Sequence, residues 1–174
     1  DSQAAVGTAA APAAASNAPA RVVNLSTEIC VIGGAGAGLT AAVSALDAGV
    51  KNIVVLEKMK QTGGCTLVGV AGMFSVESPV QKRLGINVSM DEMYRHHMDM
   101  HSWYCNAKLV RNWYTTTGSV VGWLEKKGVE FGEVAPFTHE RLYKTHHYAK
   151  KGMLGQATVD AMQKILKENG IEVR

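Results

Sequence analysis

The sequence predicts an α/β fold with a parallel sheet, on the basis of three observations. A continuous apolar run, residues 29–32, is typical of a strand that is buried on both faces. A glycine-rich turn at residues 33–38 follows it and leads into an alanine-rich helical stretch. A second apolar run at residues 53–56 ends in Glu57. Residues 28–57 are therefore predicted to form a βαβ unit of the Rossmann type, which binds a dinucleotide.

Each position of the glycine-rich turn has a physical reason. Gly33 allows a tight turn out of the first strand, and Gly38 lets the helix pack closely against that strand. Gly36 and Ala37 keep large side chains away from the turn, and Ala35 occupies the slot where the G-x-G-x-x-G pattern has its middle glycine. The helix that begins near Gly36 is expected to direct its free N–H groups and positive dipole end at a pyrophosphate.

Glu57 is predicted to accept hydrogen bonds from ribose hydroxyls, because an acid at the end of the second strand has this role in dinucleotide-binding folds. A carboxylate would repel a 2′-phosphate, which argues against NADP. A loop with two adjacent glycines, residues 58–66, follows where a simple NAD domain would pass into a helix. This second glycine-rich loop favours FAD over NAD. A Rossmann-like turn that binds no nucleotide is the alternative.

The rest of the chain is predicted to continue in a fixed order. Residues 75–88 are expected to be a surface connection, and Ser89 opens a capping box for a helix to about residue 102. A second helix is expected over residues 107–127. Its core-facing residues by helical spacing are Leu109, Val110, Trp113, Val120, Val121 and Leu124. An extended piece begins at residues 129–131, a third helix covers about 156–168, and a third strand starts at residue 171.

The domain organisation follows from composition. Residues 1–26 are expected to be a flexible, alanine-rich tether, and residues 27–174 the N-terminal portion of one domain, with residues 75–168 as a helical excursion beside the sheet. A chain that starts at Asp1 fits a mature product from which a signal peptide was removed, which would place it in the periplasm or at the cell surface. A linker cut from a longer chain, in a cytoplasmic protein, is the equal alternative.

Composition and spacing also exclude several function classes. The net charge of +3 is small and dispersed, so no nucleic-acid partner is expected, and no apolar run is long enough to cross a membrane. The three cysteines have neither disulfide nor metal-ligand spacing. His97 and His101 lie four residues apart, but no further ligand follows at a defined spacing, so a solvated helix face is predicted and no metal site.

The motifs resemble the FAD-dependent family that includes soluble fumarate reductase, urocanate reductase, 3-ketosteroid dehydrogenase and the flavoprotein subunit of succinate dehydrogenase. Residues 31–39 resemble its first FAD motif, and residues 55–58, 63–66 and 71–73 resemble its ribose-binding acid, Gly-Gly-Asn-Thr loop and Ala-Gly-Gly-Met segment. Residues 123–131 resemble a later helix-to-strand signature. The collinear resemblance covers residues 27–174. It implies a Rossmann-type FAD-binding domain, of which this chain is the N-terminal portion.

The resemblance also implies the cofactor contacts. The residues it places around FAD are Gly33, Ala35, Gly36, Ala37, Gly38, Glu57, Lys58, Gly63, Gly64, Cys65, Thr66, Ala71 and Gly72. The first five would contact the pyrophosphate and the Gly63–Thr66 loop the diphosphate, while Ala71 and Gly72 would offer N–H groups near the reactive edge of the flavin. Cys65 stands where relatives often have Asn. Its thiol could bond to the flavin or simply fill the loop.

The function implied is hydride transfer between flavin N5 and an activated carbon–carbon double bond, as in reduction of a fumarate-like carboxylate. Relatives carry their acid–base residues further along, so no residue of this chain is predicted to be catalytic. The expected partners are the remainder of the flavoprotein or a partner chain, a small-molecule acceptor and an electron donor of unassigned kind. A non-catalytic nucleotide-binding module that needs a partner chain is the alternative, and an NAD-binding domain is the third interpretation.

Overall fold

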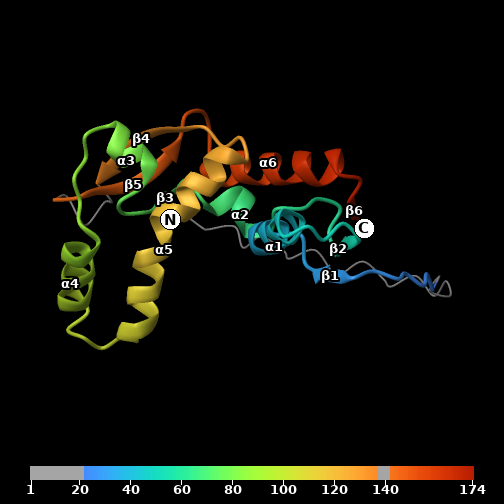
Figure 1. Ribbon diagram of the computed structural model, residues 1–174, viewed down its shortest axis with the longest axis horizontal. Coiled ribbons are helices and arrows are strands. Elements are labelled where there is room, and N and C mark those ends of the chain that lie inside the picture. The colour runs from blue at the N-terminus through green and yellow to red at the C-terminus, as the bar shows by residue number, and fades with distance from the viewer. Residues whose placement is uncertain (1–21, 137–141) are drawn as a thin grey trace, which may run out of the picture.

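The computed structural model describes residues 22–136 and 142–174, so that most of the predicted tether at residues 1–26 lies outside the described residues. The elements are β1 (Ile29–Ile32), α1 (Gly36–Asp47), β2 (Ile53–Leu56), α2 (Gly64–Gly69), β3 (Gly72–Phe74), α3 (Pro79–Arg83), α4 (Met90–Met100), α5 (Ala107–Lys126), β4 (Phe131–Pro136), β5 (Lys144–Ala149), α6 (Leu154–Glu168) and β6 (Glu172–Val173). The described strands form a parallel sheet, β1-β2-β6, and an antiparallel sheet, β3-β5-β4. Figure 1 shows the two sheets at opposite ends of the molecule.

The predicted parallel sheet is confirmed. β2 lies between β1 and β6, with Ile29 beside Ile53 and Val55 beside Val173. All three strands run in the same direction, as the βαβ pattern and the run from residue 171 predict. Because β2 is the central strand of the three, its apolar run is buried at Ile53, Val54 and Val55.

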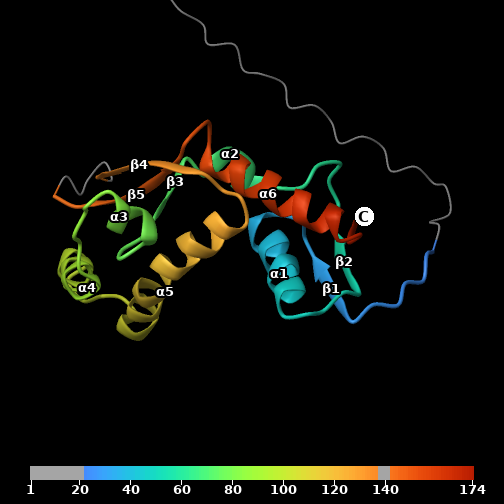
Figure 2. The same ribbon diagram turned by 45° about the horizontal axis from the view of Figure 1, so that its top comes forward.

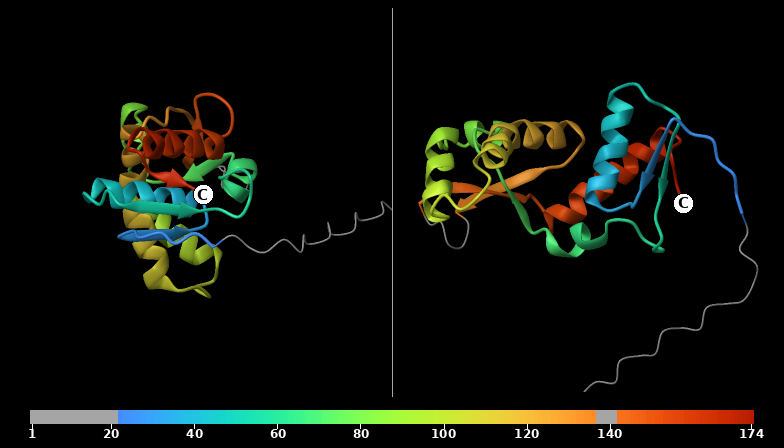
Figure 3. Two further views of the ribbon diagram at one scale, coloured as in Figure 1. Left: turned by 90° about the vertical axis from the view of Figure 1, so that its right-hand side faces the viewer. Right: turned by 90° about the horizontal axis from the view of Figure 1, so that it is seen from below.

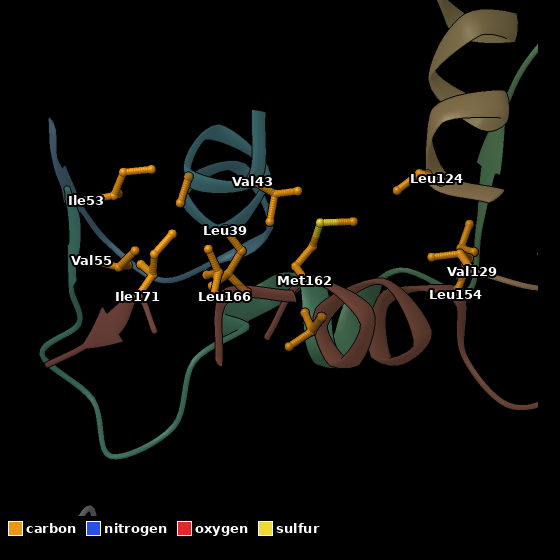
Figure 4. Packing of buried hydrophobic residues seen from close by; sticks show 12 residues of the cluster. Leu39, Val43, Ile53, Val55, Leu124, Val129, Leu154, Met162, Leu166 and Ile171 are labelled. Atoms are coloured by element: carbon orange, nitrogen blue, oxygen red, sulfur yellow. The ribbon is translucent and has the colours of Figure 1, made fainter. Parts of the chain in front are cut away.

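The main core lies on one face of this sheet, between the strands, α1 and α6. Figure 4 shows Ile53, Val55 and Ile171 facing Leu39 of α1 and Leu166 of α6. The opposite face is open at β1, where Cys30 is exposed and Ile32 is 87% exposed. Parallel sheets are normally covered on both faces, so this face lacks the cover that such a sheet usually has.

The three predicted helices are confirmed with small shifts of their ends. Ser89 is the N-cap of α4, and its hydroxyl accepts a hydrogen bond from the N–H of Glu92, which is one half of the predicted capping box. The Glu92 carboxylate accepts a hydrogen bond from the Tyr143 hydroxyl. Asn106 caps α5 in the same way as Ser89 caps α4. α6 begins two residues earlier than expected, at Leu154. Figures 2 and 3 show α4 and α5 beside the antiparallel sheet, and α1 and α6 beside the parallel strands.

The prediction for residues 75–88 as a surface connection is wrong. Ser78 and Gln81 form a complete capping box at the start of α3, with Pro79 at the first helical position. Ser75, Val76 and Ser78 are buried along with Gln81. A polar side chain can be buried when it has hydrogen-bond partners in the protein. Gln81 donates a hydrogen bond to the carbonyl oxygen of Lys144 and accepts one from the N–H of Ser78.

The predicted core face of the helix at residues 107–127 is only partly right. Leu109 and Trp113 are 64% and 44% exposed, and Val120 is 41% exposed. The buried residues of α5 are Tyr114, Thr117, Val121 and Leu124, so Val121 and Leu124 are the two predicted core residues that are buried. Thr117 is buried because its hydroxyl accepts a hydrogen bond from the N–H of Val76, which a hydropathy pattern does not register.

The stretch expected as a helical excursion, residues 75–168, also contains the strands β4 and β5. β3 and β4 both pair with β5 in antiparallel fashion, although β4 has irregular register. The loop predicted at residues 58–66 contains the start of α2, at Gly64. These short elements have too few residues for a clear period in the sequence.

A charged link joins α1 to α5. Asp47 accepts a hydrogen bond from Trp123 Nε1 at 2.8 Å and forms an ion pair with Lys127. The Lys127 ammonium, followed by the Trp123 N–H, lowers the pKa of the Asp47 carboxyl. This contact fixes the C-terminal end of α5 against the parallel half of the molecule.

His147 is buried in the middle of β5. Its Nδ1 lies 2.9 Å from the carbonyl oxygen of Thr145, and its Nε2 lies 2.7 Å from Ser78 Oγ. Since a carbonyl oxygen only accepts, Nδ1 carries the proton and Nε2 accepts the Ser78 hydroxyl. Burial lowers the pKa of the imidazole, opposed by the Thr145 and Met73 backbone hydrogen bonds, while nearby His146 lowers it and Glu125 raises it.

We expect the stability of the protein to fall as the pH drops below about 6.5, the ordinary pKa of histidine. The unfolded chain takes up the proton there, whereas buried His147 does so only below its lowered pKa. The contribution is therefore complete above pH 6.5 and lost progressively below it, with a slope of at most about 1.4 kcal/mol per pH unit. Urea unfolding at several pH values should show that the free energy of unfolding of His147→Asn depends less steeply on pH between pH 5 and 6.5 than that of wild type. Equal dependence on pH would contradict this assignment.

Candidate dinucleotide-binding site

The first glycine turn has the geometry that the sequence predicts. Gly33 has a positive φ of +101°, and a Cβ on Gly38 would fall on the carbonyl oxygen of Gly33. Ala35 is the N-cap of α1 and makes no side-chain capping hydrogen bond. The first N–H groups of a helix have no partner within it, so the start of α1 offers donors to an anion.

The second glycine turn lies directly beside the first. The N–H of Gly63 donates to the carbonyl oxygen of Gly34 at 2.8 Å, and Ala35 pairs with Gly63 as an isolated parallel bridge. The N–H of Gly36 donates to Thr66 Oγ1 at 3.2 Å. Gly63 and Gly64 both have positive φ. The two predicted turns are thus brought together by backbone contacts, about 30 residues apart in the chain.

Glu57 joins this unit through its carboxylate. Oε2 accepts a hydrogen bond from the N–H of Gly34 at 2.8 Å, and Oε1 accepts one from the N–H of Met59 at 2.9 Å. The Met59 N–H, followed by that of Gly34, lowers the pKa of the carboxyl below its ordinary value of 4.5. The side chain is therefore an anion at neutral pH, and each oxygen keeps a lone pair for a further donor.

The remaining predicted residues lie around this unit or further along. Cys65 is exposed in the first turn of α2, and Lys58 is exposed directly after Glu57. Ala71 and Gly72 lead from α2 into β3, and the carbonyl oxygen of Ala71 accepts a hydrogen bond from the N–H of Leu154. They therefore adjoin the start of α6 and not the first glycine turn.

Two contacts of this site have no signal in the sequence pattern. The Gly34 N–H that binds Glu57 occupies a variable slot of the glycine motif, so spacing alone gives it no role. Thr66 bonds to Gly36 across 30 residues, which only the fold reveals. A dinucleotide fits the site, because a helix start without a side-chain cap, closely spaced glycines and an ionised acid lie within contact of one another.

Within residues 22–136 and 142–174, no group of three or more His, Cys, Asp or Glu side chains is placed to hold a metal ion. In the same residues, no helix has the length and apolar character needed to span a membrane.

Comparison with known proteins identifies the family of the chain. A family model described as an FAD binding domain matches residues 28–173. The chain belongs to this family. FAD is therefore the cofactor that the fold is built to hold, and the resemblance seen in the motifs is confirmed.

Curated relatives of the chain are reductases or oxidoreductases by name. Vinyl phenol reductase of Lactiplantibacillus plantarum is 33% identical over 150 residues, which cover 85% of this chain and 29% of that protein. NADH:fumarate oxidoreductase of Klebsiella pneumoniae is 26% identical over 148 residues, covering 85% of this chain and 16% of that protein. The chain thus spans less than a third of either relative.

Solved structures agree with the family. The open conformation of a flavocytochrome c3 fumarate reductase superposes with a TM-score of 0.75 at 26% identity, over 85% of this chain and 26% of that one. A 3-ketosteroid dehydrogenase from Rhodococcus jostii gives a TM-score of 0.69 at 17% identity, over 85% of this chain and 37% of that one, which is a likeness of fold alone.

Proposed function

We propose that this chain is the FAD-binding part of an oxidoreductase that transfers a hydride between flavin N5 and an activated carbon–carbon double bond. The observation that carries the proposal is the joined unit of two glycine turns and Glu57, in a chain whose relatives include reductases of vinyl phenol and fumarate. The acceptor would be a small molecule, of which a carboxylate such as fumarate is one class.

Each part of the unit has a proposed role toward FAD. Gly33, Ala35, Gly36, Ala37 and Gly38 would surround the pyrophosphate at the start of α1, and Glu57 would accept hydrogen bonds from the ribose hydroxyls. The second turn, Gly63 to Thr66, would line the other side of the diphosphate, with Lys58 at its edge. Ala71 and Gly72 would present backbone N–H groups toward the flavin ring.

Bound FAD would supply the hydride chemistry, while the residues of this chain bind and orient it. Thr66 has a specific part in this. Its hydroxyl accepts the Gly36 N–H in the structure, and it can donate its own proton to a phosphate oxygen without giving up that bond. The hydroxyl would therefore join the two helix starts across the diphosphate.

The activity is tested on the full-length protein, meaning this chain together with the remainder of the flavoprotein or its partner chain. After anaerobic reduction of the flavin by dithionite, addition of fumarate, urocanate, acrylate or a vinyl phenol should restore the oxidised flavin spectrum. Succinate, which has no double bond, is the matched control and should leave the flavin reduced. Reoxidation by none of the alkenes would contradict the proposed reaction.

A second candidate function is a nucleotide-binding module that works only with a partner chain. The observation that favours it is the open face of the parallel sheet at Cys30 and Ile32. An uncovered apolar face promotes association. Light scattering on residues 22–174 alone should therefore show self-association and weak FAD binding. A monomer with equimolar FAD and reductase activity would show that this chain needs no other polypeptide.

We expect Ala35→Gly to leave the affinity for FAD unchanged or to raise it. The Ala35 methyl lies where the glycine pattern has a hydrogen, and it would be 3.2 Å from a Cβ on Gly64. Removing it widens the space between the turns, while glycine is well tolerated at an N-cap. Flavin fluorescence titration measures the dissociation constant. An increase of more than about threefold would mean that the methyl supports the turn and that this reading of the motif is wrong.

A further inference from the structure

One face of α6 packs along the second glycine turn. Gly155, Val159 and Gln163 are spaced by four, so they lie in one row along the helix. A Cβ on Gly155 would fall on the carbonyl oxygen of Thr66, and the methyl groups of Val159 would be 3.3 Å from a Cβ on Gly63. Gln163 Nε2 donates a hydrogen bond to Thr62 Oγ1. Three successive turns of α6 thus lie against Thr66, Gly63 and Thr62 in that order.

Thr62 connects this row to the first glycine turn. Its side chain is 8% exposed, and its methyl group lies 2.8 Å from where a Cβ on Gly34 would be. Gly34 in turn donates its N–H to Glu57 and its carbonyl oxygen accepts the N–H of Gly63. Thr62 therefore lies between α6 and Gly34, and Gly34 contacts both Glu57 and the second glycine turn.

The hydrogen bond of Gln163 matters because the backbone of the adjacent Gly63–Gly64 turn can adopt many conformations. Two adjacent glycines with positive φ have more accessible backbone conformations than any other pair of residues. Contacts from outside the turn must select one of them. The Gly155 N–H bond to Val70, at 2.8 Å, fixes the far end of α2, and the Gln163 bond to Thr62 fixes the near end.

We propose that Gln163 is a positioning residue for the FAD diphosphate, acting through Thr62 on the Gly63–Gly64 turn. The inference rests on the proposed FAD-binding function and adds to it a residue of α6, about 100 positions along the chain from the turn that it orients. The amide of Gln163 donates a hydrogen bond to Thr62, and Thr62 directly precedes the Gly63–Gly64 turn.

The test uses the full-length protein and four variants. Gln163→Leu removes the donor with an apolar side chain that is one atom shorter, and Thr62→Val removes the acceptor and keeps the shape. The double variant completes a thermodynamic cycle. Gln156→Leu is the matched control, because Gln156 is an exposed glutamine on the same helix whose side-chain amide donates a hydrogen bond to Asp160. The measurements are the FAD dissociation constant, the inhibition constant of ADP, which carries the diphosphate without the flavin, and the melting temperature of the apoprotein.

Gln163→Leu and Thr62→Val should each raise the FAD dissociation constant and the ADP inhibition constant by about three- to tenfold, since the hydrogen bond between the two side chains is lost. The double variant should be no weaker than either single variant, and Gln156→Leu should match wild type. The apoprotein melting temperature should change by the same amount in Gln163→Leu and Gln156→Leu, because the loss of the Gln163 hydrogen bond changes the conformation of the turn and not the stability of the fold.

Three results would overturn the inference. FAD affinity of Gln163→Leu equal to wild type would show that the turn needs no support from α6. Additive losses in the double variant would show that the two residues act independently. A loss of affinity matched by a fall in the apoprotein melting temperature, absent in Gln156→Leu, would assign Gln163 to general stability. A wild-type protein that binds no FAD would overturn the proposed function as well, which separates that failure from the other three.

Discussion

Gly38→Ala protein is expected to be recovered without bound flavin and with lowered stability. The added Cβ would fall on the carbonyl oxygen of Gly33, a backbone atom that cannot rotate away. Either α1 or the turn after β1 must shift, and overpacking of this kind costs about 1–3 kcal/mol or more. Because the same shift moves the start of α1, FAD affinity should fall by at least about tenfold. Urea unfolding and flavin titration of the full-length protein measure both effects.

Gly69→Ala is the matched control for this substitution. Gly69 also lies in a helix, and a Cβ there has nothing within 4 Å. Its stability and flavin content should equal or exceed those of wild type, because alanine favours helix. Normal flavin binding by Gly38→Ala would mean that the register assigned to residues 33–38 is wrong.

Glu57→Gln should weaken FAD binding by about tenfold or more, since charge-assisted hydrogen bonds to the ribose are lost. The substitution also harms the site from within. Two backbone N–H groups, from Gly34 and Met59, point at the carboxylate oxygens, and the NH₂ of glutamine can accept from neither. One donor therefore loses its partner whichever way the amide is turned.

The pH dependence of this loss follows from the lowered pKa of Glu57. The wild-type carboxylate stays ionised until the pH falls below a value that is itself under 4.5. The deficit of Glu57→Gln should consequently be constant between about pH 6 and 8 and shrink only in acid. Glu28→Gln, an exposed acid just before β1, is the control and should bind FAD as wild type does. An unchanged dissociation constant for Glu57→Gln would remove the ribose-binding role.

The parallel sheet and the two turns could be predicted from the sequence because their signals are local. Residues 29–32 and 53–56 are apolar without interruption, and the glycines of residues 33–38 follow immediately. Each feature needs only its neighbours to be interpreted. The joining of the two turns was implied by the family resemblance, while the structure gives its physical form in the Gly63–Gly34 and Gly36–Thr66 bonds.

The antiparallel half could be predicted less well because its core is partly polar. His147, Gln81 and Thr117 are buried through hydrogen bonds to segments that are distant in the chain. A hydropathy pattern assigns such residues to the surface. One signal was present and missed, since Ser78-Pro79 with Gln81 is the capping box of a short helix. The Gln163–Thr62 bond has no sequence signal, because it joins two ordinary polar residues from elements far apart.

The nucleotide that the full-length protein releases on denaturation distinguishes an FAD-binding protein from an NAD-binding one. Denaturation followed by chromatography and mass spectrometry of the supernatant should yield FAD in equimolar amount to the chain. If the flavin is attached covalently, the peptide that contains Cys65 should carry the mass of FAD less two hydrogens. Release of NAD, or of no nucleotide from a folded protein that also fails to take up added FAD, would contradict the account.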